Sequence, residues 1–346
     1  MESKHLTYFK VENFKRFDSL EVSDIGQFNL IVGDNNVGKT TLLEALLFDH
    51  ENYDQFLVNL ELALENRELA TDKKINYIDS YISNKGAMLK YIFHNDGIKY
   101  ELIVTKKNKH ELTEKDLNSD IIVQLKLNDS PNFVQIALND KSDVKVVSLL
   151  DENKEINFHF PFLGPKNIYD EEAFDFAATI SESYRKLEIF KNELKYFLPN
   201  IISIEAGTSI INGDSIIIIR ETNSDNPFPL QSYGDGFIKF FRCLLKMELS
   251  SNKRLMIDEI DTGIHYSRMK EFLKKVIQSA KNKNVQIFAT THSKECIEYY
   301  TQALKELGYE KEGRIIRIAD TKSGIKAYTM NYEQFENSLI AESEIR

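Results

Sequence analysis

The chain has 346 residues, of which 42% are hydrophobic and 28% are charged, and its formal net charge is −10. This composition fits a folded protein with a large core and excludes an intrinsically disordered or fibrous chain. The acidic excess creates no overall field that attracts nucleic acid, so a contact of that kind would need a local basic patch.

The first 48 residues predict strands, a glycine turn and a helix. Residues 28–32 are apolar throughout, which is typical of a parallel strand buried on both faces, and the alternating residues 5–11 predict an earlier strand. Gly33 ends the apolar strand, and residues 40–48 have the apolar spacing of a buried helix. This order predicts a βα unit.

The next part of the chain changes from a helical to an alternating pattern. Residues 51–80 have helical spacing, whereas polar and apolar residues alternate from 89 to about 163. Asp96-Gly97 lies between two alternating runs and predicts a hairpin turn. Further strands are expected at 120–127, 133–138, 144–150 and 157–163.

The remaining residues begin with one long predicted helix and end with alternating strands and helices. The long helix is amphipathic and covers 171–197, before Pro199, and Asn212-Gly213 predicts a second hairpin. Helices are then expected at 235–250, 266–280 and 293–307, and strands at 254–258, 285–290, 314–319 and 325–330. Strands interleaved with helices of this length indicate a parallel α/β sheet.

Residues 33–40 match the P-loop pattern GxxxxGK[ST] between a predicted strand and a predicted helix. In this pattern the loop amides surround phosphate oxygens, Lys39 reaches the β- and γ-phosphates, and the Thr40 hydroxyl binds Mg²⁺. A chance glycine turn is the alternative, which the flanking strand and helix disfavour. ATP and Mg²⁺ are therefore the expected cofactors. The candidate nucleotide-binding residues are Gly33, Asn35, Asn36, Gly38, Lys39, Thr40 and Thr41.

Two carboxylates follow another apolar strand, as in a Walker B element. Asp258 and Glu259 come directly after residues 255–257, and open α/β sheets bind their ligands at strand ends. Asp258 is suited to hold Mg²⁺ together with Thr40, and Glu259 is suited to orient or deprotonate an attacking water. An acidic pair after a strand is often only a solvated turn, but the P-loop favours the catalytic interpretation.

Two further element boundaries carry polar residues of interest. His292 follows the strand expected at 285–290 and could hydrogen-bond a γ-phosphate or the attacking water, although a single histidine is more often structural. Ser232, Gly234 and Gly236 surround the start of the helix expected at 235–250. They are either a simple helix cap or a second anion-binding helix N-terminus.

Taken together, these motifs resemble the ABC-type ATPases. Their order is a P-loop, a Ser-x-Gly element, an Asp-Glu pair after a strand, and a histidine after the next strand. Residues 11–17 (VENFKRF) and 258–265 (DEIDTGIH) are similar to the RecF, OLD and SMC-related ATPases, often labelled AAA-15 or AAA-21, rather than to transporter subunits. The resemblance covers residues 4–48 and 228–300.

The resemblance implies an α/β fold, that of a P-loop NTPase of the ABC-ATPase-head type. Its core is expected to be a mixed sheet, accompanied by an N-terminal antiparallel β subdomain and a helical insertion. We expect a single head over residues 1–346. Its approximate lobes are 1–165 with the P-loop and the β subdomain, 166–231 with the insertion, and 232–346 with the signature, Walker B element and histidine.

The resemblance also implies roles for individual residues. In this family two heads enclose two nucleotides, so a homodimer or higher homo-oligomer is expected, and the signature of one head contacts the γ-phosphate held by the other. The D-loop couples the two sites. The residues that match are Ser232, Gly234 and Gly236 for the signature in trans, Asp261 for the D-loop, Glu259, His292 and Lys39 for catalysis, and Thr40 and Asp258 for the metal.

Several positions are left open. Lys15, Arg16 and Phe17 lie where family members contact the base or phosphates, but a solvated basic turn is an equal alternative. No Q-loop glutamine can be assigned, because Gln124 and Gln135 fall in predicted strands and are expected to be sheet residues. The basic clusters at 106–110, 274–275 and 281–283 are expected to be solvated faces rather than nucleic-acid contacts.

The leading hypothesis is an ATPase that dimerises on ATP and controls a separate effector. The resemblance suggests a TOPRIM-type nuclease as effector, in a bacterial anti-phage system such as PARIS. The start of the chain lacks the pattern of a signal peptide. Cys243 and Cys296 fall in predicted helices, which suggests reduced thiols. A cytoplasmic protein without a membrane segment is therefore expected. The alternatives are a RecF-like DNA-binding clamp in repair, which the net charge disfavours, and a non-hydrolysing scaffold, which Glu259 disfavours.

Overall fold

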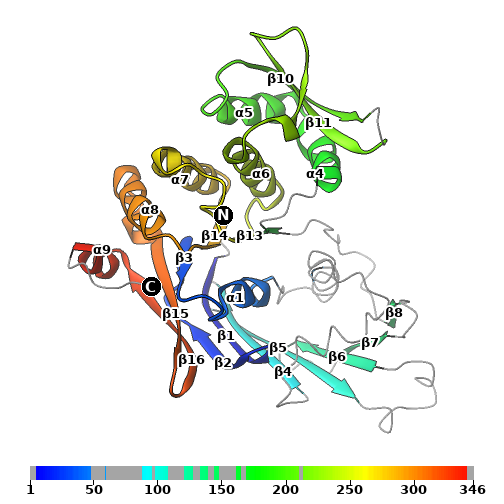
Figure 1. Cartoon of the computed structure of the whole chain (residues 1–346). Helices are drawn as coiled ribbons and strands as arrows, with labels where there is room; N and C mark the ends of the chain where they lie inside the picture. Colours follow the sequence, from blue (N-terminus) through cyan, green and yellow to red (C-terminus); the bar gives the residue numbers. More distant parts are fainter. Residues whose placement is uncertain are drawn as a thin grey trace.

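A computed structural model describes residues 5–47, 59, 88–95, 98–107, 121–127, 133–138, 144–147, 161–164, 169–209 and 213–340. Figure 1 shows a central sheet with helices along one face, a second sheet beside it and a smaller lobe of helices and strands. The helix expected over 51–80, apart from Asn59, the Asp96-Gly97 turn and residues 108–110 of the first basic cluster lie outside the described residues.

The central sheet has six strands in the order β16-β15-β3-β14-β13-β9. They are β3 (Phe28–Val32), β9 (Phe162–Leu163), β13 (Arg254–Ile257), β14 (Gln286–Thr290), β15 (Gly313–Thr321) and β16 (Gly324–Asn331). The strands from β15 to β9 run parallel, and β16 pairs antiparallel with β15. Every residue of β3 and β14 is buried, as expected for strands covered on both faces. The predicted mixed α/β core is confirmed.

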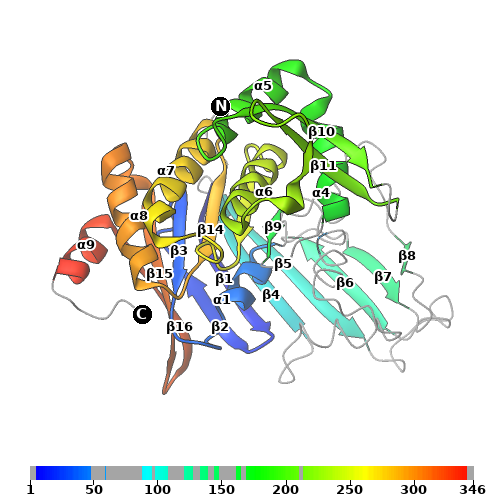
Figure 2. The same cartoon turned by 45° about the horizontal axis from the view of Figure 1, so that its top comes forward.

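Alternate residues of β3 pack into two different layers. Leu30 and Val32 belong to a cluster with helices α6, α7 and α8, whereas Ile31 packs with α1 and the second sheet. Figure 2 shows α7 and α8 on one side of β3 and α1 on the other. These helices are α1 (Lys39–Ala45), α6 (Asp235–Leu249), α7 (Tyr266–Asn282) and α8 (Lys294–Leu307). Because both faces are covered, the ends of the core strands are held in fixed positions.

The second sheet is antiparallel and has the strand order β2-β1-β4-β5-β6-β7-β8. Its strands are β1 (Leu6–Phe14), β2 (Phe17–Val22), β4 (Met88–Asn95), β5 (Ile98–Lys107), β6 (Ile121–Leu127), β7 (Phe133–Leu138) and β8 (Val144–Val147). The alternating pattern was therefore a sound basis for predicting strands. Gln124 pairs with Gln135 across β6 and β7, so both are sheet residues, as expected.

A lobe of short elements follows β9 in the chain and packs against α6 (Figure 1). They are α4 (Tyr169–Phe176), a π-helical turn (Ala177–Ser181), α5 (Tyr184–Leu194), β10 (Ile201–Thr208), β11 (Ser215–Glu221), β12 (Phe228–Pro229) and a 3₁₀ turn (Leu230–Ser232). The expectation of one helix over 171–197 is wrong. Ser183 is extended and its Oγ accepts a hydrogen bond from the Lys186 N–H at 3.4 Å, which begins α5 as a new helix. The predicted hairpin is confirmed by the pairing of β10 with β11.

Helix α9 (Tyr332–Ile340) follows β16 and was not predicted. Its start is a capping box, in which the Asn331 side chain accepts from the Gln334 N–H at 3.1 Å and the Gln334 side chain accepts from the Asn331 N–H at 2.9 Å. Phe335 is fully buried and joins the same core cluster as α8. The Asn-x-x-Gln pattern was the signal that would have predicted this helix.

Cys243 in α6 and Cys296 in α8 are both buried and both free thiols. Burial raises the pKa of Cys243 to about 11 and that of Cys296 to about 12, so both thiols stay protonated at neutral pH. Across the described ranges, no helix combines the length and the hydropathy needed to cross a bilayer.

Candidate functional site

The loop between β3 and α1 has a backbone shape that only glycine allows at two positions. Gly33 and Gly38 have φ values of 147° and 112°, outside the region open to other residues. A Cβ on Gly33 would lie 2.3 Å from the Ile318 carbonyl oxygen, and one on Gly38 would lie 2.8 Å from the Phe17 ring. The P-loop therefore rests against β15 on one side and the second sheet on the other.

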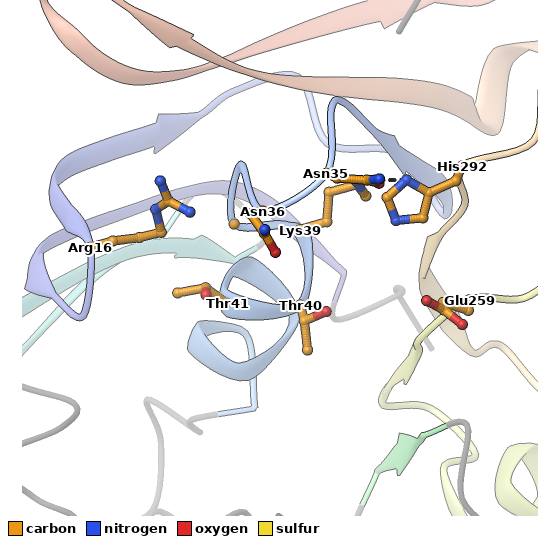
Figure 3. Close-up of a pocket in the computed structure, with 9 residues that line it drawn as sticks. Arg16, Asn35, Asn36, Lys39, Thr40, Thr41, Glu259 and His292 are labelled. Carbon is orange, nitrogen blue, oxygen red and sulfur yellow. Dashed lines mark hydrogen bonds between the residues drawn. The ribbon is translucent and has the colours of Figure 1, made fainter.

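A polar cavity of about 460 Å³ opens above this loop. Figure 3 shows Lys39 and His292 pointing toward each other, with Arg16 and Glu259 on opposite sides of the view. The cavity is therefore built from the β1–β2 turn, the P-loop, and the ends of β13 and β14. Its lining residues are Arg16, Asn35, Asn36, Gly38, Lys39, Thr40, Thr41, Glu259 and His292.

Lys39 is held inside the loop that it belongs to. Its Nζ donates to the carbonyl oxygens of Gly33 at 2.7 Å and Asp34 at 2.8 Å, and it lies 3.2 Å from Nδ1 of His292. Lys39 as a whole residue is only 5% exposed. Burial lowers the pKa of Lys39, and the charges of Asp34, Asp258 and Glu259 act in the opposite direction. A partly desolvated cation of this kind is suited to attract the phosphates of a bound anion.

Asp258 connects the P-loop to the end of β14. The Thr40 hydroxyl donates to Oδ2 of Asp258 at 3.0 Å, and the Thr290 hydroxyl donates to Oδ1 at 2.6 Å. Hydroxyl and carboxylate oxygens are the ligands that Mg²⁺ prefers, so Thr40 and Asp258 are placed to share one cation. Within the part of the chain that the structure describes, no three His, Cys, Asp or Glu side chains form a metal-binding cluster.

Glu259 is held at its backbone and at its carboxylate. Its φ of 48° lies in the left-handed region, its N–H donates to Thr290 Oγ1 at 2.8 Å, and its Oε2 accepts from the Thr262 hydroxyl at 3.0 Å. Thr290 therefore bonds to both carboxylate residues that follow β13. The sequence placed Thr290 at the end of a strand but did not single it out, because a threonine there could equally be an ordinary sheet residue.

The signature residues lie away from this cavity. Ser232 and Gly234 are exposed, and Gly236 lies in the first turn of α6. A Cβ on Gly236 would lie 3.4 Å from the Gly263 carbonyl oxygen, so the signature turn contacts the loop after β13. In that loop, Asp261 accepts a hydrogen bond from the Thr291 hydroxyl at 2.7 Å. The structure thus brings together the P-loop, Asp258, Glu259 and His292, and leaves the signature and Asp261 outside the cavity.

The three residues at the basic turn after β1 lie in different environments. Arg16 is exposed and lines the cavity, and its contact with a base or a phosphate stays a prediction. Lys15 forms an ion pair with Glu44 of α1. Phe17 is buried beneath Gly38. The turn therefore supports the P-loop with two side chains and presents one cation to the cavity.

Comparisons with known proteins found a matching family and sequence relatives. Residues 28–298 match the family described as "AAA domain, putative AbiEii toxin, Type IV TA system". The chain is 26% identical over 347 aligned residues to an ATP/GTP phosphatase of Helicobacter pylori, with 88% of this chain and 90% of that protein covered. It is also 27% identical over 105 residues to the DNA replication and repair protein RecF of Oceanobacillus iheyensis, which covers 30% of this chain and 25% of RecF.

A solved structure supports the fold alone. An SMC head bound to the C-terminal winged-helix domain of ScpA has a TM-score of 0.54 with this chain at 13% sequence identity. The match covers 96% of this chain and 99% of that one. The arrangement of the two sheets and the helices is therefore that of an ABC-ATPase head.

Replacing Thr290 with valine should destabilise the protein, because the Asp258 carboxylate loses a donor and the Glu259 N–H loses its acceptor. We expect the free energy of unfolding, measured by urea denaturation, to fall by about 1–3 kcal/mol. Thr301→Val is the matched control, since the Thr301 hydroxyl only adds a bond to the Ile297 carbonyl within α8. The free energy of unfolding of Thr301→Val should fall by less than about 0.5 kcal/mol. Equal losses in the two variants would contradict the connecting role of Thr290.

Proposed function

Because the chain belongs to this AAA domain family, as an ABC-type P-loop ATPase of the RecF and SMC group, we propose that it hydrolyses ATP in the cavity around Lys39. The observation that carries the proposal is the convergence of Lys39, Glu259 and His292 on one polar cavity. A phosphate-binding loop, a candidate base and a candidate sensor of the terminal phosphate lie within reach of one triphosphate. The similarity to an ATP/GTP phosphatase supports hydrolysis rather than binding alone.

In this proposal, the P-loop binds the β- and γ-phosphates through its amides and through Lys39. Thr40 and Asp258 would hold Mg²⁺, and the ion would supply positive charge beside the phosphate oxygens. The 3.0 Å contact between the two side chains supports this assignment, because it shows that the hydroxyl oxygen and a carboxylate oxygen are close enough to bind one cation.

Glu259 orients and deprotonates the attacking water. Its bonds to Thr290 and Thr262 restrict the carboxylate to the side of the cavity nearest the end of β13. His292 contacts the Lys39 ammonium from the next strand. A bound γ-phosphate would compete for that ammonium, so His292 is suited to register whether the terminal phosphate is present.

The site is proposed to be completed by a second copy of the chain. Ser232 and Gly234 are exposed and do not line the cavity of their own head, which supports a role across a dimer. The γ-phosphate would be shared between Lys39 of one head and Ser232 of the other. ADP lacks this group, so the closed dimer would be favoured only with ATP. Asp261, through its bond to Thr291 beside His292, is suited to couple the two sites.

We further infer that the dimer controls a separate effector, with a TOPRIM-type nuclease as the candidate, in bacterial defence against phage. The support is the description of the family, which names a toxin system. The switch described above would supply the control, because the open and closed dimers present different surfaces to a partner.

A RecF-like DNA clamp is the alternative function, favoured by the match to RecF over 105 residues. The charges in the described part of the chain count against it. Lys274 pairs with Glu306, Lys281 with Glu312 and Lys283 with Glu193, so these lysines are already neutralised. That the basic clusters are solvated faces rather than nucleic-acid contacts stays a prediction.

Replacing Glu259 with glutamine should lower the rate of phosphate release about 10²–10⁴-fold, because the amide cannot accept the proton of the attacking water. ATP binding should persist, and light scattering after gel filtration with Mg²⁺ and ATP should show an accumulated dimer. Glu333→Gln, at an exposed position in the first turn of α9, is the control and should match the wild type. Turnover by Glu259→Gln at the wild-type rate would exclude Glu259 as the base.

Mixing two inactive variants should restore activity if the site is shared between heads. Lys39→Ala cannot bind ATP productively but supplies an intact signature, whereas Ser232→Arg has an intact P-loop. Only the mixed dimer contains one complete site, so an equimolar mixture should recover about a quarter of wild-type turnover. Mixtures that remain inactive over a range of concentrations would contradict the shared site.

The biological role separates the two functions. Cells that express the chain with its neighbouring genes should resist phage, and Lys39→Ala should abolish the reduction in plaque number while leaving the protein folded. A clamp would instead bind duplex DNA in the presence of ATP, with an affinity that falls steeply from 50 to 200 mM salt, by about 10³-fold or more. Tight, salt-sensitive binding without phage resistance would favour the clamp.

A further inference from the structure

Helix α6 carries three buried cations on one face. Lys239, Arg242 and Lys246 are spaced three and four residues apart and are 6%, 4% and 5% exposed. Residues at this spacing share one side of a helix, and here that side packs into the core. Basic side chains are seldom buried this deeply unless each has a specific partner.

The three cations have different kinds of partner. Lys246 forms an ion pair with Asp175 of α4 at 3.1 Å, and Arg242 lies 3.5 Å from the carbonyl oxygen of Gly164. Among the described residues, Lys239 donates to two main-chain carbonyl oxygens, that of Asp258 at 3.3 Å and that of Glu259 at 3.1 Å. Lys239 is therefore the buried cation of α6 that contacts the peptide carrying the candidate base.

The backbone of Glu259 is held from two separate elements. The Thr290 hydroxyl oxygen at the end of β14 accepts a hydrogen bond from the Glu259 N–H, and Lys239 on α6 donates one to the Glu259 carbonyl oxygen. Glu259 also has a left-handed φ of 48°, which a residue with a Cβ adopts only when its surroundings enforce it. The hydrogen bonds from Thr290 and Lys239 hold the Glu259 main chain in this conformation. The direction of the Glu259 carboxylate follows from this backbone conformation.

We propose that Lys239 is a positioning residue for Glu259, which rests on the proposed ATPase function and goes beyond it. Lys239 does not touch the cavity, and acts by fixing the carbonyl of the base-bearing residue. A charged donor suits this task because it bonds more strongly to a carbonyl oxygen than a neutral donor does. Burial lowers the pKa of Lys239, because the ammonium is largely removed from water.

Lys239→Met should therefore lower kcat for ATP hydrolysis about 10–100-fold, because a small displacement of the base is costly, while the Kd for ATP stays within about threefold of wild type. Lys239→Arg, which keeps the charge and the donors, should recover part of kcat. In a Glu259→Gln background, Lys239→Met should cause no further loss of turnover, since the proposal assigns its effect to the Glu259 carboxylate and not to the second contact, with the Asp258 carbonyl.

The matched control is Lys246→Met, on the same helix, equally buried and remote from Glu259. It breaks a buried ion pair, so it should lower the melting temperature at least as much as Lys239→Met, yet leave kcat per folded molecule within about twofold. Should Lys239→Met fail to fold, Lys239→Gln, which keeps a neutral donor, serves for the same comparison.

Wild-type kcat in Lys239→Met, or in Lys239→Gln used in its place, would overturn the proposal. An equal loss of kcat in Lys246→Met, or a further loss in the Glu259→Gln background, would also overturn it. Wild-type turnover identifies which claim has failed. If the wild-type chain hydrolyses ATP and the Lys239 variants do so equally well, only the positioning role is wrong. If the wild-type chain does not hydrolyse ATP, the proposed function fails and the positioning role fails with it.

Discussion

Three parallel strands end at one edge of the central sheet, and the arrangement of the site depends on that shared edge. β3 leads into the P-loop, β13 into Asp258 and Glu259, and β14 into Thr290 and His292. These segments are more than 200 residues apart in the chain at their widest, yet β14 pairs with β3 on one side and β13 on the other. The hydrogen-bonded register of the strands therefore sets the distances between the polar groups that follow them.

Covering the sheet on both faces makes this edge rigid. The residues of β3 alternate between the cluster with α7 and α8 and the cluster with α1, so the strand cannot shift without disturbing two cores. The polar groups beyond the strand ends are then joined to one another by short bonds, among them Thr290 to Asp258 at 2.6 Å. Apolar packing fixes the strand ends, and the hydrogen bonds fix the directions of the side chains.

Local patterns in the sequence predicted the core strands and most helices of the described residues, although α9 was missed, and they predicted the motif residues around the cavity. The P-loop, Asp258, Glu259 and His292 each follow an apolar strand, which is a signal that needs no knowledge of the fold. Lys239 and Thr290 could not be found in this way, because their roles depend on contacts that form only when separate elements pack together. Lys239 bonds to main-chain carbonyl oxygens after β13, and Thr290 bonds to the Asp258 carboxylate and to the Glu259 N–H. The break near Ser183 was missed for a related reason. An amphipathic pattern continues across residues 171–197, and a single side-chain cap decides where the second helix begins.

The bonds of Lys39 have a consequence for the cycle of a nucleotide-binding head. The ammonium is already satisfied by the carbonyl oxygens of Gly33 and Asp34, so it is not left unpaired between one ligand and the next. An incoming phosphate only has to draw the ammonium away from contacts within the loop. The loop can therefore keep its shape through arrival and departure, and loading and emptying the pocket need not involve local refolding.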